Sequence, residues 1–179
     1  MICAKLIPTL FVVALTGCAS CTDGKHQHPS ADGRRISMAI PDQGRVNFRV
    51  PLGWHIVQTG PPTYVFKKEP HGDVQLHVSY EKEDVTPETD PAELHKKKLA
   101  SLRNPFGSSG NQQRGSQRTA DGTHALIYLC VSDGEELSAI IPRDGFFVEV
   151  GLHTIQNLEH LVLHRPAFLT LLRSIAFSH

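Results

Sequence analysis

Val74-Gln75-Leu76-His77-Val78-Ser79-Tyr80 is the stretch that decides the fold, because apolar and polar residues alternate along it without interruption. Successive side chains of a β-strand point to opposite faces of a sheet, so the alternation predicts a strand with one buried and one polar face. The turn residues Glu69-Pro70-His71-Gly72 stand just before it. Such half-buried strands are typical of antiparallel sheets that cover a core on one side.

The residues upstream repeat this pattern in shorter runs. Strands are predicted over 46–50, 54–56 and 64–66, and the chain is already strand-like from Ile36. Pro51-Leu52-Gly53 and Gly60-Pro61-Pro62 separate these runs, because proline and glycine interrupt regular structure.

Downstream of Tyr80 the hydrophobic period lengthens from two residues to between three and four. Asp90 can cap a helix, Pro91 suits its first position, and Glu93 stands three residues after Asp90 as in a capping box. The predicted inner face of this helix, which ends at Asn104-Pro105, carries His95, Leu99, Leu102 and Phe106.

The second half of the chain returns to strands. A loop is predicted over 107–115, strands over about 113–119, 123–132, 136–142 and 146–150, and a closing helix that begins by His164-Arg165-Pro166. Asp144-Gly145 is a strong hairpin signal between the last two strands. The order of strands, helix, strands, helix places the protein in the α+β class with a largely antiparallel sheet.

The N-terminus predicts export and lipidation. Leu15-Thr16-Gly17-Cys18 resembles the lipobox of bacterial lipoproteins, and Lys5 and a short apolar run precede it as in an export signal. The run has roughly half of the ~20 apolar residues that a membrane-spanning helix needs. We therefore expect residues 1–17 to be a cleaved signal peptide and Cys18 to carry the lipid.

Residues 18–35 are expected to be the lipidated cysteine and a flexible tether, because almost none of them is apolar. Residues 36–179 then form a single domain. In the enterobacterial sorting rule for lipoproteins, an Asp after the lipidated cysteine implies inner-membrane retention. Ala19 therefore indicates the outer membrane, with the domain on its periplasmic face.

Composition argues against nucleic acid as a partner. The chain has 18 basic and 18 acidic residues, so no excess of positive charge neutralises a phosphate backbone. An exported compartment would allow a disulfide between Cys21 and Cys130. Cys130 lies within the apolar run 125–131, where a free buried cysteine is the commoner outcome. We expect no disulfide.

No residue pattern specifies a reaction. The sequence has no Gly-x-Ser-x-Gly, no His-Glu-x-x-His and no phosphate-binding loop. His160 and His164 stand four residues apart, and His26 and His28 lie in the tether, but neither pair is joined by the further ligands that zinc requires. We expect a non-enzymatic protein with no catalytic residue, no cofactor and no metal ion.

One row of polar residues leaves an alternative open. If the strands pair in the predicted register, the polar face of the sheet carries Arg49, His77, Glu149 and His153. Such a row could line a ligand groove. A solvated or helix-covered face is the other interpretation, since alternating strands must point polar residues away from the core.

Several segments resemble the Mog1/PsbP-like superfamily, many bacterial members of which are small lipoproteins. The resemblance covers roughly residues 36–177 and is carried by Phe48-Arg49-Val50-Pro51-Leu52-Gly53-Trp54, strand 74–80, hairpin 136–150 and the helix end Leu172-Arg173-Ser174-Ile175. It implies an α/β/α sandwich: a curved, largely antiparallel sheet of about 6–7 strands with two main helices packed on it. It also implies binding and assembly rather than catalysis, and it supplies no catalytic residues.

Three functions remain open from the sequence. The first is a membrane-tethered module that binds a protein partner, with an immunity or chaperone-like protein for a secreted effector as its narrower form. The second is a small-ligand carrier or hydrolase that uses His77, Glu149 and His153 in a cleft of the sheet. The third is a structural envelope protein without a specific ligand. The identity of the partner and the oligomeric state are left open.

Overall fold

The computed structural model describes residues 33–69, 72–101, 110–131, 134–155 and 158–178. The predicted signal peptide, Cys18, Cys21 and most of the tether lie outside these residues, as do Leu102, Phe106 and Asn104-Pro105 of the predicted first helix. Among the described residues, regular structure begins at Arg35.

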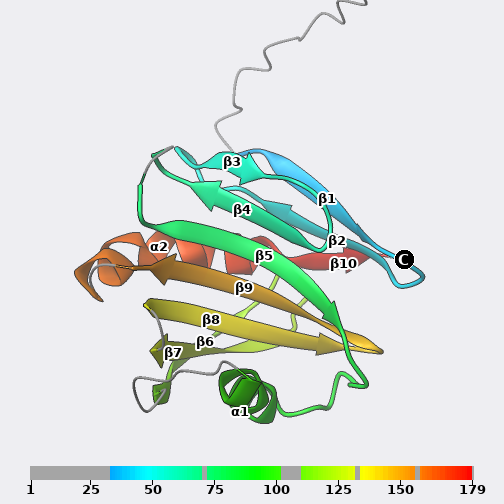
Figure 1. Ribbon diagram of the computed structural model, residues 1–179. Helices are drawn as coiled ribbons and strands as arrows, with labels where there is room; N and C mark the ends of the chain where they lie inside the picture. Colours follow the sequence, from blue (N-terminus) through cyan, green and yellow to red (C-terminus); the bar gives the residue numbers. More distant parts are fainter. Residues whose placement is uncertain (1–32, 70–71, 102–109, 132–133, 156–157, 179) are drawn as a thin grey trace, which may run out of the picture.

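The largest element is a seven-stranded antiparallel sheet (Figure 1). Its strands follow the order β3-β4-β5-β9-β8-β7-β6. They are β3 (His55–Gln58), β4 (Thr63–Lys67), β5 (Gln75–Lys82), β6 (Gly110–Arg118), β7 (His124–Val131), β8 (Glu135–Arg143) and β9 (Phe146–Thr154). The predicted α+β class and the hairpin at Asp144-Gly145 are confirmed. The strand that decided the prediction, β5, pairs with β9 at the centre of the sheet.

A second, three-stranded sheet was not predicted as a separate unit. It has the order β1-β2-β10 and consists of β1 (Arg35–Ile40), β2 (Gly44–Arg49) and β10 (Ala176–Ser178). The last strand places the C-terminal residues beside β2 near the start of the domain. A strand of three residues has no local pattern that predicts this pairing, because only the tertiary structure brings residues 176–178 beside residues 45–47.

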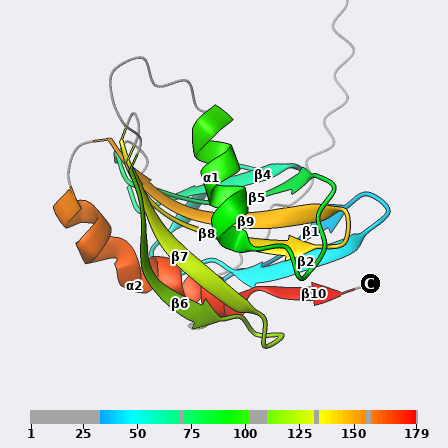
Figure 2. The same cartoon turned by 90° about the horizontal axis from the view of Figure 1, so that it is seen from below.

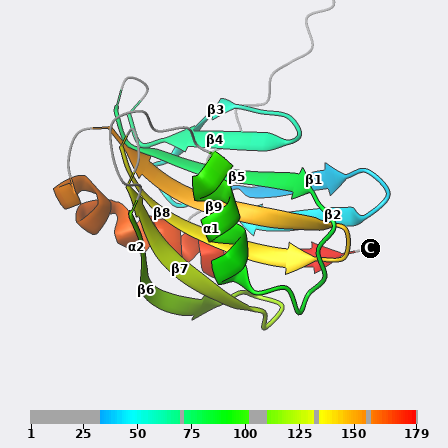
Figure 3. The ribbon, with the colours of Figure 1, turned by 60° about the horizontal axis from the view of Figure 1, so that its bottom comes forward.

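Two helices cover opposite faces of the large sheet (Figures 2 and 3). Helix α1 (Pro91–Ser101) crosses the outer face over β7 and β8, and α2 (Leu158–Ser174) lies on the other side against β9 and β2. The predicted sandwich with two main helices is therefore confirmed. Neither described helix has the length and apolar character needed to cross a membrane.

The start of α1 was predicted correctly. Pro91 is the first helical residue, and the carboxylate of Asp90 accepts a hydrogen bond from the backbone N–H of Ala92 at 2.9 Å. This bond satisfies one of the donors that a helix start leaves unpaired. Leu94 and His95 are buried on the side of the helix that faces the sheet.

The predicted start of the closing helix was wrong. Helix α2 begins at Leu158 rather than by His164, and Pro166 lies inside it. Proline cannot donate the hydrogen bond that an interior residue normally makes. Pro166 is exposed, so water can satisfy the carbonyl left without a partner, and buried Leu161 already belongs to the inner face of the helix.

The predicted loop over 107–115 was also wrong at its C-terminal end. Strand β6 begins at Gly110 and pairs with β7, with a register shift between Gln113 and Gly115. Gly115 has a φ of 147°, which suits this irregularity. A polar segment with two glycines looks like a loop, yet its backbone can still complete the edge of a sheet.

The main core lies between the large sheet, α2 and the small sheet. Leu76 and Val78 of β5 lie opposite Leu152 and Val150 of β9, and all four are fully buried. Helix α2 adds the fully buried side chains of Phe168, Leu171 and Leu172 to this core, and Ile175, the residue after the helix, is fully buried with them. The opposite face of the same strands carries His77, Ser79 and Glu149 and lies toward α1.

Candidate functional site

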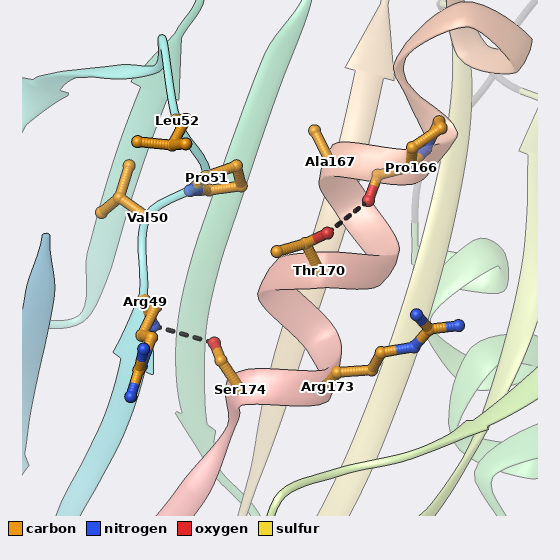
Figure 4. Close-up of a pocket in the computed structure, with 9 residues that line it drawn as sticks. All are labelled: Arg49, Val50, Pro51, Leu52, Pro166, Ala167, Thr170, Arg173 and Ser174. Carbon is orange, nitrogen blue, oxygen red and sulfur yellow. Dashed lines mark hydrogen bonds between the residues drawn. The ribbon is translucent and has the colours of Figure 1, made fainter. Parts of the chain in front are cut away.

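A groove runs between α2 and the segment that connects β2 to β3 (Figure 4). Its volume is about 600 Å³. The lining residues are Arg49, Val50, Pro51, Leu52, Pro166, Ala167, Thr170, Arg173 and Ser174. Four of them belong to Phe48-Arg49-Val50-Pro51-Leu52-Gly53-Trp54, the stretch that carries the family resemblance.

The first wall of the groove is a tight turn. The backbone N–H of Trp54 donates to the carbonyl of Pro51 at 3.2 Å, and Gly53 adopts a φ of 77°, which favours glycine. Trp54 is buried and packs edge-on against His164 of α2, with 5.6 Å between ring centroids. This anchor leaves Leu52 at the tip of the turn, 62% exposed.

The second wall is one face of α2. Figure 4 shows Ala167, Thr170 and Ser174 directed toward the turn. The hydroxyl of Ser174 accepts a hydrogen bond from the backbone N–H of Arg49 at 2.8 Å and donates one to the carbonyl of Leu171 at 2.7 Å. These bonds fix the end of the helix to β2, so the distance between the two walls is set by the fold.

The groove has basic side chains at this end. Figure 4 shows the side chains of Arg49 and Arg173 on either side of Ser174, with that of Arg173 directed away from the turn, and Arg173 Nε donates to Gln117 Oε1 at 2.9 Å. A second cavity of about 450 Å³ shares Arg49 and Ser174 with the groove and adds Arg35. Guanidinium groups bind carboxylates through paired hydrogen bonds, so this end of the groove favours acidic groups.

The apolar surface continues beyond the groove along α2. Leu163 stands four residues before Ala167, which places it on the same helix face one turn earlier. Leu163 is 67% exposed and its neighbour Val162 is 69% exposed. Large apolar side chains gathered around a groove are typical of a binding surface.

The polar row predicted from the sequence is only partly brought together. His77 and His153 both approach Glu136, with His77 Nε2 3.9 Å from Oε1 and His153 Nδ1 3.9 Å from Oε2. Glu149 lies within 4.8 Å of the ligand atoms of His77 and Glu136. The prediction that Arg49 joins this row was wrong, because Arg49 belongs to β2 in the small sheet and lines the groove instead.

Three residues of this cluster were missed by sequence reasoning. Glu136 and Ser138 lie on β8, and Lys98 reaches the sheet from α1. Ser138 Oγ donates to Glu149 Oε1 at 2.8 Å, and Lys98 Nζ is hydrogen-bonded to the same carboxylate oxygen. The alternation along β8 could have indicated Glu136 and Ser138. Lys98 looked like one of three solvated lysines, and its contact depends on where α1 packs.

The Lys98–Glu149 pair is charged although Glu149 is buried and Lys98 is only 32% exposed. Burial by itself would raise the pKa of Glu149, but the charges of Lys98 and His77 and the hydrogen bonds from Lys98 and Ser138 lower it below its ordinary value. Burial likewise opposes the charged form of Lys98, yet Glu149 and Glu136 raise its pKa overall. Each partner therefore keeps the other ionised inside the α1 face.

Two further groups near the cluster stay neutral. His95 packs against the ring of Tyr128 at 4.2 Å, and burial lowers its pKa to about 4. Burial and the charge of Glu136 raise the pKa of the Cys130 thiol to about 12. The prediction that Cys130 is a buried core residue was wrong, because it is half-buried on β7, outside the core clusters. A thiol that stays protonated agrees with the prediction that it is not an activated nucleophile.

The remaining histidines raised in the sequence do not form a common site with this cluster. His164 contacts Trp54, and burial lowers its pKa. His160 lies on the same helix, and the tether histidines His26 and His28 lie outside the described residues. Within the described chain, the group of three side chains close enough to hold one metal ion is His77, Glu136 and Glu149.

The sequence matches no known protein family and no curated protein. Solved structures with the same fold include the cyanobacterial PsbP (CyanoP) of Synechocystis. It is 16% identical with a TM-score of 0.52, and the match covers 87% of this chain and all of that one. Another is LpqN of Mycobacterium tuberculosis, which is involved in cell envelope biogenesis. It is 14% identical with a TM-score of 0.51, and the match covers 82% of this chain and 91% of that one.

A variant of the protein Mog1 is also similar, at 12% identity and a TM-score of 0.48, over 80% of this chain and 96% of that one. Identities this low relate folds and not functions. The similarity to CyanoP and LpqN shows that the chain has the PsbP-like α+β fold that its sequence resembled.

Proposed function

We propose that this protein is an outer-membrane lipoprotein on the periplasmic side whose domain binds a protein partner and catalyses no reaction. The observation that carries the proposal is the groove beside α2. There Leu52 is held exposed by a rigid turn, and apolar and basic side chains lie next to one another. Protein-binding surfaces combine such apolar anchors with arginine.

The anchor part of the proposal rests on the sequence. Residues 15–18 match a lipobox, and the described domain starts at Arg35. A flexible chain of about seventeen residues, the length expected for the tether, would span roughly 20–25 Å, so a domain attached through Cys18 would stay close to the membrane and remain free to turn. Such a tether suits a protein that captures a partner near the envelope surface.

The groove favours a partner segment of definite chemistry. Leu52 and Pro166 offer contact area to apolar side chains, while Arg49 and Arg173 offer charged hydrogen bonds to a carboxylate. We therefore expect an extended or helical segment in which one or two apolar residues stand next to Asp or Glu. In the narrower form of the proposal this segment belongs to a secreted effector, and the lipoprotein acts as its immunity or chaperone-like protein.

The test is a site-specific photo-cross-link in cells that express the full chain. A photoreactive residue at position 52 should capture one dominant protein, because Leu52 would lie inside the interface. The matched control places the photoreactive residue at position 131 instead. Val131 is also an exposed apolar residue, 41% exposed, but it lies on β7, away from the groove. Arg173→Glu should weaken the captured partner's affinity roughly tenfold, as expected for loss of one charged contact.

The same cells test the anchor. Cys18→Ala should abolish labelling with a palmitate analogue and move the protein out of the membrane fraction. Equal labelling of Cys18→Ala would contradict the anchor, and identical cross-links from positions 52 and 131 would contradict the groove. A clean protein without any partner at position 52 would also count against the binding proposal.

A second candidate function remains, because His77, Glu149 and His153 do converge with Glu136. This is the arrangement that a small-ligand carrier or hydrolase would need. Helix α1 packs across this face, and both cavities described above lie on the α2 side. The polar cluster is therefore the weaker candidate for a substrate cleft.

A further inference from the structure

The polar cluster has features that neither a protein-binding module nor a solvated sheet face requires. His77 on β5, Glu136 on β8 and Glu149 on β9 come from three different strands and meet over one point of the sheet. Their ligand atoms all lie within 4.8 Å of one another. The convergence is a product of the strand order, in which β9 lies between β5 and β8.

A glycine makes this convergence possible. Gly151 lies on β9 between His77 and Ser138 in the register, so a side chain there would occupy the centre of the cluster. A Cβ added at Gly151 would stand 2.1 Å from Cε1 of His77 and 2.8 Å from Oε1 of Glu136. The imidazole and the carboxylate therefore lie directly on the backbone, in a space that only glycine leaves open.

A second glycine, Gly134, leaves room for the ring of the neighbouring His153. A Cβ at Gly134 would stand 2.8 Å from Cε1 of His153. His153 approaches the other oxygen of Glu136, so Glu136 lies between two imidazole rings.

The hydrogen bonds of the cluster are incomplete. Glu136 Oε1 is buried and has no hydrogen-bond partner among the described residues, although the side chain as a whole is 21% exposed. His77 Nε2 is 3.9 Å from this oxygen, too far for a hydrogen bond. A buried carboxylate oxygen without a partner is costly, and a bound cation would satisfy it.

We propose that His77, Glu136 and Glu149 bind one divalent transition-metal ion, such as Zn²⁺. One imidazole nitrogen and two carboxylates form a mixed ligand set that suits such ions better than Mg²⁺ or Ca²⁺, which prefer oxygen alone. Ligand bonds of about 2.0–2.2 Å place two ligand atoms roughly 3.3 Å apart around a tetrahedral ion. Rotations of the three side chains that bring their ligand atoms closer by up to about 1.5 Å would complete the site.

The ion can reach the ligands from solvent. The side chains of His77 and Glu136 are 19% and 21% exposed, whereas Glu149 is 8% exposed and forms the floor of the site. One coordination position would face outward, beside His153.

Lys98 is the competitor of the metal ion. Its ammonium group is hydrogen-bonded to Glu149 Oε1, the carboxylate that the ion would share. Binding of a divalent cation would displace Lys98 from Glu149 and loosen one contact that holds α1 on the sheet. The structure thus predicts that metal affinity rises when the positive charge at position 98 is removed.

The test uses the full chain in detergent after treatment with a chelator. Zn²⁺ binding is measured by calorimetry and by the shift of the thermal unfolding temperature, with Mg²⁺ at equal concentration for comparison. We expect one Zn²⁺ per chain and a rise in the unfolding temperature with Zn²⁺ but not with Mg²⁺. His77→Ala and Glu136→Gln should each weaken Zn²⁺ binding at least tenfold.

Three controls make the result specific. His55→Ala removes an exposed strand histidine and should leave the affinity unchanged. His26→Ala with His28→Ala removes the tether pair and should also leave it unchanged. Lys98→Met should tighten Zn²⁺ binding several-fold, whereas Lys96→Met, at a lysine 77% exposed, should not. Circular dichroism of each metal-free variant establishes that it is folded.

The inference would be overturned by any of three results: no Zn²⁺ binding at micromolar concentration, unchanged affinity in folded His77→Ala and Glu136→Gln, or loss of the signal in the tether variant. The partner-binding proposal is independent, because the cross-link at position 52 is on the opposite side of the sheet.

Discussion

The two faces of the seven-stranded sheet are built from the same alternating strands but differ in what covers them. On the α2 face, apolar side chains of the sheet meet Phe168, Leu171 and Leu172 in one continuous core. On the α1 face, a small apolar cluster of Val85, Leu94, Ile140 and Phe147 lies beside the ion pair of Lys98 and Glu149. The comparison indicates that packing on the α2 face contributes most of the free energy of unfolding. The α1 face instead holds charged side chains, which an apolar core would exclude.

The largest expected effect is a difference in stability between core substitutions on the two faces of the sheet. Phe168→Ala should lower the free energy of unfolding by about 3–5 kcal/mol, because it leaves a cavity in the main core. Leu94→Ala should cost about 2 kcal/mol, near the lower end for such changes, because its small cluster at the edge of α1 can close around the gap. Urea denaturation measures both. Equal decreases in the free energy of unfolding would mean that the apolar cluster under α1 stabilises the protein as much as the main core does.

A smaller effect should appear on the α1 face in acid. His95 is buried with its pKa lowered to about 4, so the unfolded chain takes up a proton between pH 6.5 and 4 and the folded chain does not. Its contribution to stability is therefore lost as the pH falls through this range, by about 2.5 kcal/mol at pH 4.5. His95→Phe should remove that share of the acid sensitivity in urea denaturation at pH 7 and 4.5. An unchanged pH dependence would mean that His95 is protonated in the fold.

The smallest effect concerns the space over Gly151. Gly151→Ala should cost about 1–3 kcal/mol, because the new methyl group collides with the ring of His77. In Gly151→Ala combined with His77→Ala most of this loss should disappear, and a double-mutant cycle measures the coupling. Additive losses would show that the ring does not lie on the backbone, and the proposed metal ligands would then not converge there.

Much of the α2 face could be predicted from the sequence. Val74–Tyr80 indicated a strand with one buried face, and Leu76 and Val78 are indeed fully buried. The start of α1 at Pro91 could be predicted as well, because the cap is a local contact: the carboxylate of Asp90 accepts a hydrogen bond from the backbone N–H of Ala92, two residues later. The start of α2 could not be predicted, since Pro166 is tolerated only because it is on the exposed side of a helix whose inner face is already packed.

The candidate sites were less predictable. His77, Glu149 and His153 were found on a common face because strand alternation fixes the direction of each side chain. Arg49 was misplaced, because alternation does not reveal that β2 belongs to a different sheet. The groove was not foreseen: Pro51-Leu52-Gly53 was identified as a turn, but its opposite wall is supplied by α2, more than a hundred residues later.

The sequence by itself determined the alternating strands, the α+β class and the helix cap at Asp90, and it predicts an export signal at residues 1–17. These depend on neighbours along the chain, whose spacing sets which way each side chain points. Only the tertiary structure decided the small sheet, the partner of Glu149 and the setting of Leu52 beside α2. Those depend on which strands pair and where each helix packs, because contacts across many residues follow from the burial of whole faces rather than from any local pattern.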